Sequence, residues 1–510
     1  MHTIHQIAKY SMKKRKRSFL SVLCCVMIVY AGVQFMYLND DYSPLQLLSS
    51  VENEATRLMR FMGQVHLQCN VSLPTNNAST WVLCLDQDVG LHLWSDETYK
   101  DGIVYSIGPS PDFSFERMVA DNLSHHLYIF SAPVPYRNQL IRISNTTSVF
   151  KVNIVPNDPA DFARNSFDTQ TLNSVMSTLK HGQIDVLKLD SNVEGVQSYD
   201  VLRFLVEDGI LKKVKELHIV LKLDKVEEDD IYSWYRALYG LFHTAGFRLY
   251  HSSTSDPLCL QATIMESCIY YMSWVRKPPP HILVMYPPAI DGSLHNEEDR
   301  MVNFLEQSSS QDHRFVPVPF NSGGQGMSIF MPLTLAPRKF RASSVFFFQG
   351  QNDMPVESVP GSKGIHCQAY TLSYEITNGN SLTVYQRRQS SSREEAKWEE
   401  LTTSTWLKLL KESGANILVL NIVPGWTLLS QLSYHGIPKY LDEVVIKDPM
   451  FSAGSAVKQQ PMYLRRKYSE MKRLEEFGLR LTQVGKFPEN TLKFGTQEMY
   501  WLYFVRKTVL

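Results

Sequence analysis

The chain has 510 residues, of which 44% are hydrophobic and 20% are charged. This exceeds what one compact core needs, because a domain usually contains roughly 100–200 residues. The 51 basic and 51 acidic residues balance, so net charge gives no electrostatic basis for a nucleic-acid partner. We therefore expect a multidomain globular chain and no nucleic-acid binding.

The N-terminal segment has the pattern of a membrane anchor. Residues 13–17 are all basic, and residues 18–38 carry no charge. A helix of this length spans about 30 Å of hydrocarbon, and a basic flank stays in the cytosol. We therefore expect a cytosolic tail over 1–17, a transmembrane signal-anchor over 18–38, and a single-pass type II protein of the Golgi or another secretory-pathway membrane. Two alternatives are a signal peptide cleaved near Ala31-Gly32 and a buried core helix.

Apolar residues then recur at helical spacing from Pro44 to Met62, which predicts a helix in a stem over 39–80. Further along, short apolar runs alternate with helical patterns, an arrangement typical of a mostly parallel sheet with helices on both faces. The predicted strands are 81–94, 102–107, 126–130, 140–143, 184–189 and 216–221, and the predicted helices are 113–121, 168–180, 199–208 and 232–244. Three consecutive prolines after Lys277 predict a linker.

Glycosylation sequons and cysteines fit an oxidising compartment. Four N-x-[ST] patterns predict glycans at Asn70, Asn77, Asn122 and Asn145. The disulfide candidates are Cys69 with Cys84 and Cys259 with Cys268, although buried reduced thiols are an equal alternative for the second pair. No cysteine or histidine spacing indicates a metal site. We expect the bulk of the chain to be lumenal or extracellular, with a protein or glycan partner there and the membrane bound through residues 18–38.

A long-period repeat sets the domain organisation. The strand that ends at Asp190 resembles the strand that ends at Asn421, and Gly246 and Gly478 follow them at almost equal intervals. The aromatic segments that contain Val275 and Val505 are in the same register. A repeat of this kind indicates two structural units, which we place at 81–277 and 344–510 with a connecting segment over 278–343. In such doubly wound sheets, ligands bind beyond the carboxyl ends of the strands.

The first unit resembles a known family. The residues that carry the resemblance are Tyr105-Ser-Ile-Gly-Pro-Ser-Pro-Asp-Phe-Ser-Phe-Glu116, Asp185-Val-Leu-Lys-Leu-Asp190, Phe247-Arg-Leu-Tyr-His-Ser252 and Tyr271-Met-Ser-Trp-Val275. They are similar to the membrane-anchored methyltransferase-like protein 24 family. The resemblance implies a class I methyltransferase fold that binds S-adenosylmethionine, with Gly108 at the first motif and Asp190 and Glu194 near the donor. The expected fold class is therefore α/β, a transmembrane helix followed by two tandem Rossmann-like domains.

The sequence departs from this family's pattern where the donor would be held. Ser131 stands where an acidic residue normally accepts hydrogen bonds from the ribose, and a hydroxyl is a weaker acceptor than a carboxylate. Extra residues follow Asp190 before Glu194, and Asn421 replaces Asp190 in the second unit. We therefore predict a degenerate second unit and a lumenal interaction or scaffold module, with no cofactor. The alternative is an active S-adenosylmethionine-dependent O-methyltransferase of the secretory pathway, with no assignable catalytic base. A glycosyltransferase is a third possibility, but its metal motif is missing.

Overall fold

The computed structural model describes residues 43–74, 80–86, 102–109, 113–123, 125–131, 146–156, 169–190, 198–223, 228–254, 268–308, 315–322, 325–332, 344–348, 368–377, 381–387, 398–402, 405, 408, 417–420, 425–448, 460–488 and 498–506. The two large β-sheets, which define what we call the first and second units, both belong to the compact part Leu47–Leu510.

The first unit alternates strands and helices, as its apolar pattern predicts. In chain order the elements are α2 (Val51–Met62), β1 (Ser72–Leu73), β2 (Leu83–Cys84), β3 (Ile103–Ile107), α3 (Ser114–Asn122), β4 (His126–Phe130), β5 (Thr147–Phe150), β6 (Asn153–Ile154), β7 (Thr169–Gln170), α6 (Leu172–Leu179), β8 (Ile184–Leu189), α7 (Ser198–Glu207), β9 (Val214–Leu223), α8 (Glu228–His243), β10 (Phe247–Thr254) and β11 (Cys268–Arg276). Every residue of β8 is buried, as expected of a strand covered on both faces. The predicted strand 140–143 lies outside the described residues.

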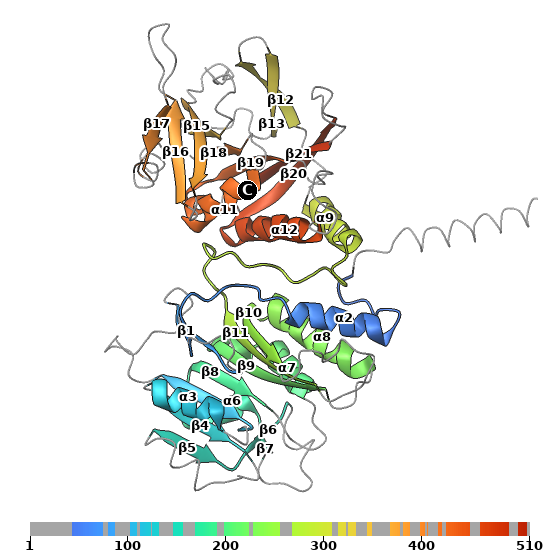
Figure 1. The fold of residues 1–510 in the computed structure, drawn as a ribbon, viewed down its shortest axis with the longest axis vertical. Helices are drawn as coiled ribbons and strands as arrows, with labels where there is room; N and C mark the ends of the chain where they lie inside the picture. The colour runs from blue at the N-terminus through green and yellow to red at the C-terminus, as the bar shows by residue number, and fades with distance from the viewer. Residues whose placement is uncertain are drawn as a thin grey trace, which may run out of the picture. The chain divides into compact units, whose positions relative to one another are not determined.

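The first sheet has a Rossmann-like strand order. It runs β10-β11-β9-β8-β3-β4-β5 (Figure 1). The pairs β9-β8, β8-β3, β3-β4 and β4-β5 are parallel, and β11 is antiparallel to both β9 and β10. Chain order reverses between β3 and β8, so the switch point, where doubly wound folds bind ligands, lies at the carboxyl ends of these two strands.

The second unit repeats most of this scheme. Its elements are α9 (Leu294–Ser308), β12 (Phe315–Ser322), β13 (Gln325–Pro332), β14 (Ser344–Phe348), β15 (Gln368–Thr377), β16 (Ser381–Arg387), β17 (Trp398–Leu401), β18 (Ile417–Leu420), α11 (Gly425–Tyr434), β19 (Glu443–Asp448), α12 (Gln460–Glu476), β20 (Leu479–Pro488) and β21 (Glu498–Arg506). Its sheet order is β17-β16-β15-β14-β18-β19-β21-β20. The order corresponds strand for strand to the first sheet, except that the antiparallel pair β16-β17 stands where β5 extends the first sheet.

The repeat extends to individual residues. Gly246 and Gly478 both adopt positive φ, at 77° and 88°, directly before β10 and β20. Arg248 pairs with Val275 in the first sheet, and Arg480 pairs with Val505 in the second. Each pairing is then interrupted by an irregularity, after Leu249 in β10 and after Leu481 in β20. The landmarks that predicted the repeat therefore occupy equivalent positions.

The helix α2, which lies in the predicted stem, packs against the first unit. Ser50 caps it by accepting a hydrogen bond from the Asn53 amide, as N-cap serines do. Glu54 and Arg57 form a buried ion pair one turn apart. The Arg57 guanidinium lies 4.0 Å from the centre of the Tyr235 ring of α8, and Phe61 meets the same ring edge-on at 5.7 Å.

The helix α9 makes the same contacts in the second unit. Ser293 accepts a hydrogen bond from the Asn296 amide, and Glu297 and Arg300 form the equivalent ion pair. Arg300 lies 4.3 Å from the centre of the Tyr468 ring of α12, which Phe304 meets edge-on at 5.5 Å. We call α2 and α9 the clamp helices. Each of them packs against the helix that precedes the last two strands of its sheet, which is α8 before β10 and β11 and α12 before β20 and β21.

The structure corrects the predicted transmembrane helix. Among the described residues, no helix is both long enough and apolar enough to cross a membrane. The predicted span, 18–38, itself lies outside the described residues. For the described residues, the fold class that the structure supports is α/β with two Rossmann-like sheets and no membrane-spanning helix.

Candidate functional site

A glycine turn stands at the switch point of the first sheet. Gly108 follows β3 with φ +68°, and its amide donates to the Phe130 carbonyl at 3.0 Å. A Cβ atom at this position would lie 1.7 Å from the Asp190 carbonyl oxygen. Both the positive φ and the contact exclude a side chain here. The turn therefore brings the ends of β3 and β8 into direct backbone contact.

A buried ion pair lies beneath this turn. The Lys188 ammonium, from β8, donates to the Gly108 carbonyl at 3.0 Å and to Glu116 of α3 at 3.1 Å. Glu116 also accepts a hydrogen bond from the Ser106 hydroxyl at 2.5 Å. Both charged side chains are fully buried, and the ammonium lies 5.5 Å from the centre of the Trp81 ring. The space under the turn is thus filled by internal polar contacts.

The predicted donor carboxylate, Asp190, is also paired within the chain. Lys222 of β9 donates to Asp190 Oδ1 at 2.7 Å. The aspartate side chain is 6% exposed and the lysine side chain is 31% exposed. A ligand hydroxyl or ammonium that approached Asp190 would therefore compete with an intramolecular cation that already holds it.

Ser131 lies next to these residues at the end of β4, where its amide donates to the Phe150 carbonyl at 3.1 Å. The structure thus places Gly108, Ser131 and Asp190 at one edge of the sheet. Glu194 lies outside the described residues. At this edge the described residues keep the glycine turn but offer one already paired carboxylate and a neutral hydroxyl. The ribose and amino group of S-adenosylmethionine would be held best by charged acceptors, and among the described residues of this edge Asp190 is the carboxylate in such a position.

The second unit has its own buried pair at the carboxyl end of β19. Lys467 of α12 donates to Asp448 at 2.5 Å, and both side chains are almost fully buried. Burial raises the pKa of Asp448 and lowers the pKa of Lys467. Asn421 lies outside the described residues. The sequence analysis missed this pair, although an aspartate that ends a strand was the signal that had selected Asp190.

A chain of buried hydrogen bonds, which we call the relay, links the neighbouring strands β9 and β11 of the first sheet. The Ser273 hydroxyl lies 3.0 Å from His218 Nδ1, and His218 Nε2 lies 3.0 Å from Glu216. The connectivity is that of a hydrolase triad, yet all three side chains are fully buried. Tyr250 also donates to Glu216, and the Trp81 ring covers His218 at 6.0 Å. Because all three side chains are buried away from any substrate, we interpret the hydrogen bonds of this relay as structural.

Cys69 and Cys84 form a disulfide. The nearby Asp86 carboxylate accepts hydrogen bonds from the amides of Asn70 and Val71. Asp86 and the two cysteines are close enough to hold a cation, but disulfide sulfurs are not the thiolates that bind metals. Cys268 begins β11, and Cys259 lies outside the described residues.

Two of the predicted sequons can be placed. Asn70 and Asn122 are both exposed. Asn122 ends α3, where its side-chain amide donates to the Met118 carbonyl at 2.8 Å. Asn77 and Asn145 lie outside the described residues.

Comparison with known proteins adds little to this geometry. No protein-family model matches the chain, and no curated protein is similar to it in sequence. Among solved structures, the chain is similar to the fibrillarin pre-rRNA processing protein of Methanococcus jannaschii at 15% identity, over 35% of this chain and 68% of that chain, with a TM-score of 0.22. This score is too low to carry an argument. The methyltransferase-like fold rests on the strand order, and membership of a particular family is not shown.

Proposed function

We propose that this chain is a tandem methyltransferase-like protein that acts as an interaction or scaffold module and does not transfer methyl groups. The observation that carries this proposal is the contact of Asp190 with Lys222 at 2.7 Å. The predicted donor carboxylate is paired within the chain, so a methyl donor would compete with Lys222 for Asp190 Oδ1.

The cost of losing charged acceptors can be expressed as a loss of donor affinity. A hydrogen bond to a charged group contributes roughly 1.5–3 kcal/mol, so its loss lowers an affinity about tenfold to a hundredfold. Ser131 adds a second loss, because it is a neutral group where the ribose would otherwise meet a carboxylate. Together these two losses would weaken donor binding by more than either loss alone.

A second candidate function is an active S-adenosylmethionine-dependent O-methyltransferase. The observation that favours it is the glycine turn, because Gly108 keeps both the positive φ and the close approach to Asp190. If the donor were bound, it would supply an electrophilic methyl group. Gly108, Ser131 and Asp190 would then line its site.

We further propose that the described part of the chain lies in an oxidising, secretory compartment. The disulfide between Cys69 and Cys84 and the exposed sequon at Asn70 support this location, since disulfides persist there and not in the cytosol. The partner we propose is a lumenal protein or glycan. The balanced charge argues against nucleic acid.

Complementation with an Asp190→Asn variant tests the scaffold role. In cells that lack the protein, the variant is expected to restore the wild-type phenotype, because asparagine keeps the side-chain shape and removes only the charge that a donor would need. Arg203→Gln, which alters an exposed pair, is the matched control. If Asp190→Asn fails while the variant is produced at the wild-type level with an unchanged thermal midpoint, the methyltransferase alternative is favoured.

A further inference from the structure

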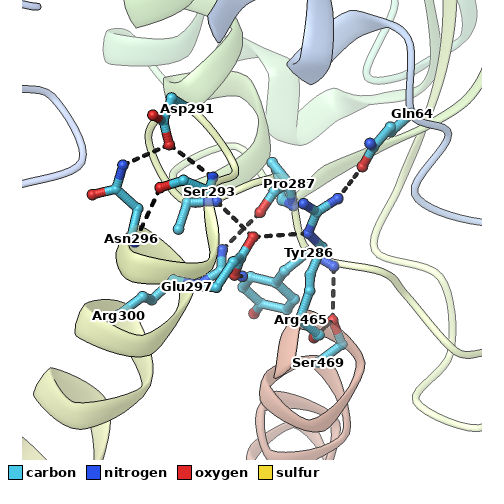
Figure 2. Close-up of polar contacts among 11 residues, drawn as sticks. Gln64, Tyr286, Pro287, Asp291, Ser293, Asn296, Glu297, Arg300, Arg465 and Ser469 are labelled. Carbon is cyan, nitrogen blue, oxygen red and sulfur yellow. Dashed lines mark hydrogen bonds and ion pairs between the residues drawn. The ribbon is translucent and has the colours of Figure 1, made fainter. Parts of the chain in front are cut away.

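Arg465 of α12 joins residues of both units. Its Nε atom donates to Glu297 of the clamp helix α9 at 3.0 Å, and its Nη1 atom donates to Gln64, which follows the clamp helix α2 of the first unit. Figure 2 shows this guanidinium between the two acceptors. Arg465 is 4% exposed. Its contact with Glu297 is buried and its contact with Gln64 is partly buried, so the pair with Glu297 carries more weight than a surface pair does.

Arg465 is an addition to the repeated clamp. In the first unit, Glu54 binds Arg57 and accepts the Leu48 amide at 2.7 Å. In the second unit, Glu297 binds Arg300 and accepts the Ala289 amide at 3.0 Å, and Arg465 adds a further contact to it.

The position of Arg465 holds a tyrosine in the first unit. Arg465 stands three residues before Tyr468, the ring that packs on the clamp, and Tyr232 stands three residues before the equivalent Tyr235. The contact from the clamp to the other unit, through Arg465, is therefore a feature of the second unit.

The same face of α12 also holds the connecting segment. Ser469 accepts the Tyr286 amide at 2.9 Å, and Arg473 donates to the Pro280 carbonyl at 2.7 Å. The Tyr286 ring meets Phe242 of the first unit at 5.0 Å and Tyr468 of the second at 5.2 Å, both edge-on. The segment is therefore fixed by backbone and by ring contacts.

The first unit also contacts the connecting segment and α12. The Met285 amide donates to the His66 carbonyl at 2.7 Å. A separate ion pair, from Arg248 at the start of β10 to Glu476 at the end of α12, spans 3.6 Å.

A glycine with positive φ packs beside Arg465. Gly292, with φ +69°, lies against it, and a Cβ atom there would be 3.0 Å from Pro288, 3.4 Å from Arg465 and 3.6 Å from Arg60 of the first clamp helix. Arg60 and Arg465 come from different units, and the turn before α9 brings them to the same glycine.

We propose that Arg465 holds the two units together as one rigid body. It does so at an inter-unit joint, which we define as Gln64, residues 280–293, Glu297 and the face of α12 that runs from Arg465 to Glu476. We call Arg465 the lock of this joint. This deepens the proposed scaffold function and rests on it for its biological meaning. A partner would then meet the surfaces of both units in a fixed arrangement. The lock itself is a property of the fold and is testable without any ligand.

Hydrogen exchange on the full chain tests the lock. The amides to follow are those of Met285 and Tyr286, because both are bonded across the joint. Arg465→Met removes the guanidinium but leaves Glu297 paired with Arg300. We expect exchange at both amides to accelerate at least about tenfold, while amides within β8 and β9 stay protected. Arg466→Met is the matched control, because the neighbouring Arg466 is exposed and its loss should leave exchange unchanged.

Wild-type exchange at Met285 and Tyr286 in the Arg465→Met protein overturns the proposal. If that variant loses protection in β8 and β9 as well, Arg465→Lys decides, because it keeps the charge but loses the rigid planar fork that meets the two acceptors. If Arg465→Lys accelerates exchange at these two amides alone, the result supports the lock. If exchange at both amides is unchanged in Arg465→Lys, the proposal is wrong. Donor binding plays no part in this readout, so the scaffold function and the joint can fail separately.

Discussion

Glu216 and Glu443 occupy the same register position in the two sheets. Glu216 pairs with Val275 across β9 and β11, and Glu443 pairs with Val505 across β19 and β21. Both carboxyl groups are buried, and each accepts a tyrosine hydroxyl. Tyr250 is in β10, whereas Tyr503 is in β21. Each unit therefore has a buried glutamate at this position, but the tyrosine that donates to it comes from a different strand.

Glu443 should make stability depend on pH. Burial raises its pKa from 4.5 to about 7. Between these values the folded protein keeps a proton that the unfolded chain loses, so the free energy of unfolding falls as pH rises from about 4.5 to about 7. The contribution is about 3 kcal/mol. Urea unfolding at pH 5 and pH 7.5 measures it.

The matched variant is Glu443→Gln, which can still accept the Tyr503 hydroxyl but does not titrate. Its free energy of unfolding should lack this part of the pH dependence. As pH rises from 5 to 7.5, the stability of the variant should therefore increase relative to that of the wild type. An identical pH profile for the two proteins would show that Glu443 is not the responsible group.

Lys188 and Glu116 should be strongly coupled, because each compensates a fully buried charge. Lys188→Met leaves Glu116 unpaired and is expected to cost about 3–5 kcal/mol of stability. The double variant Lys188→Met/Glu116→Gln should recover much of this loss. Denaturant titration of the single and double variants gives the coupling energy.

The exposed pair Arg203–Asp200 provides the control, since Arg203→Met should cost no more than about 1 kcal/mol. Equal costs for Lys188→Met and Arg203→Met would contradict a buried, compensated pair under the glycine turn.

The disulfide should contribute measurably to folding. Cys69 and Cys84 are 15 residues apart, and closing a loop of that length typically contributes about 3 kcal/mol. The double substitution to serine should lower the free energy of unfolding by that order. Reductant should have the same effect on the wild type and none on the variant. A wild-type protein insensitive to reductant would argue against the bond in solution.

Much of the sheet could be predicted from the sequence. Strands 103–107, 126–130 and 184–189 lie where the apolar runs indicate, because buried parallel strands need continuous apolar residues. The repeat was visible through Gly246 and Gly478, since a positive φ before an edge strand favours glycine.

The helix over 44–62 was predicted, but its repetition as α9 was missed although the signal is in the sequence. Ser50, Asn53, Glu54, Arg57 and Phe61 recur at identical spacing as Ser293, Asn296, Glu297, Arg300 and Phe304. The sequence analysis assigned the first set to a stem and the second to a connecting segment. Comparing those ranges with each other would have shown the repeat.

The internal ion pairs could not be predicted in the same way. Lys188 lies in an otherwise apolar strand, and its partner Glu116 is in a helix that follows a different strand. Only the crossover that places β8 beside β3 brings them together. The same holds for Asp190 and Lys222, which meet through the pairing of β8 with β9.

Titration calorimetry of the full chain with S-adenosylmethionine and with its demethylated product tests the central claim most directly. Because Asp190 is held by Lys222, we predict no saturable heat for either compound at micromolar concentrations. Micromolar binding by the wild type that is abolished in an Asp190→Ala variant with an unchanged thermal midpoint would contradict the scaffold assignment and establish a working donor site.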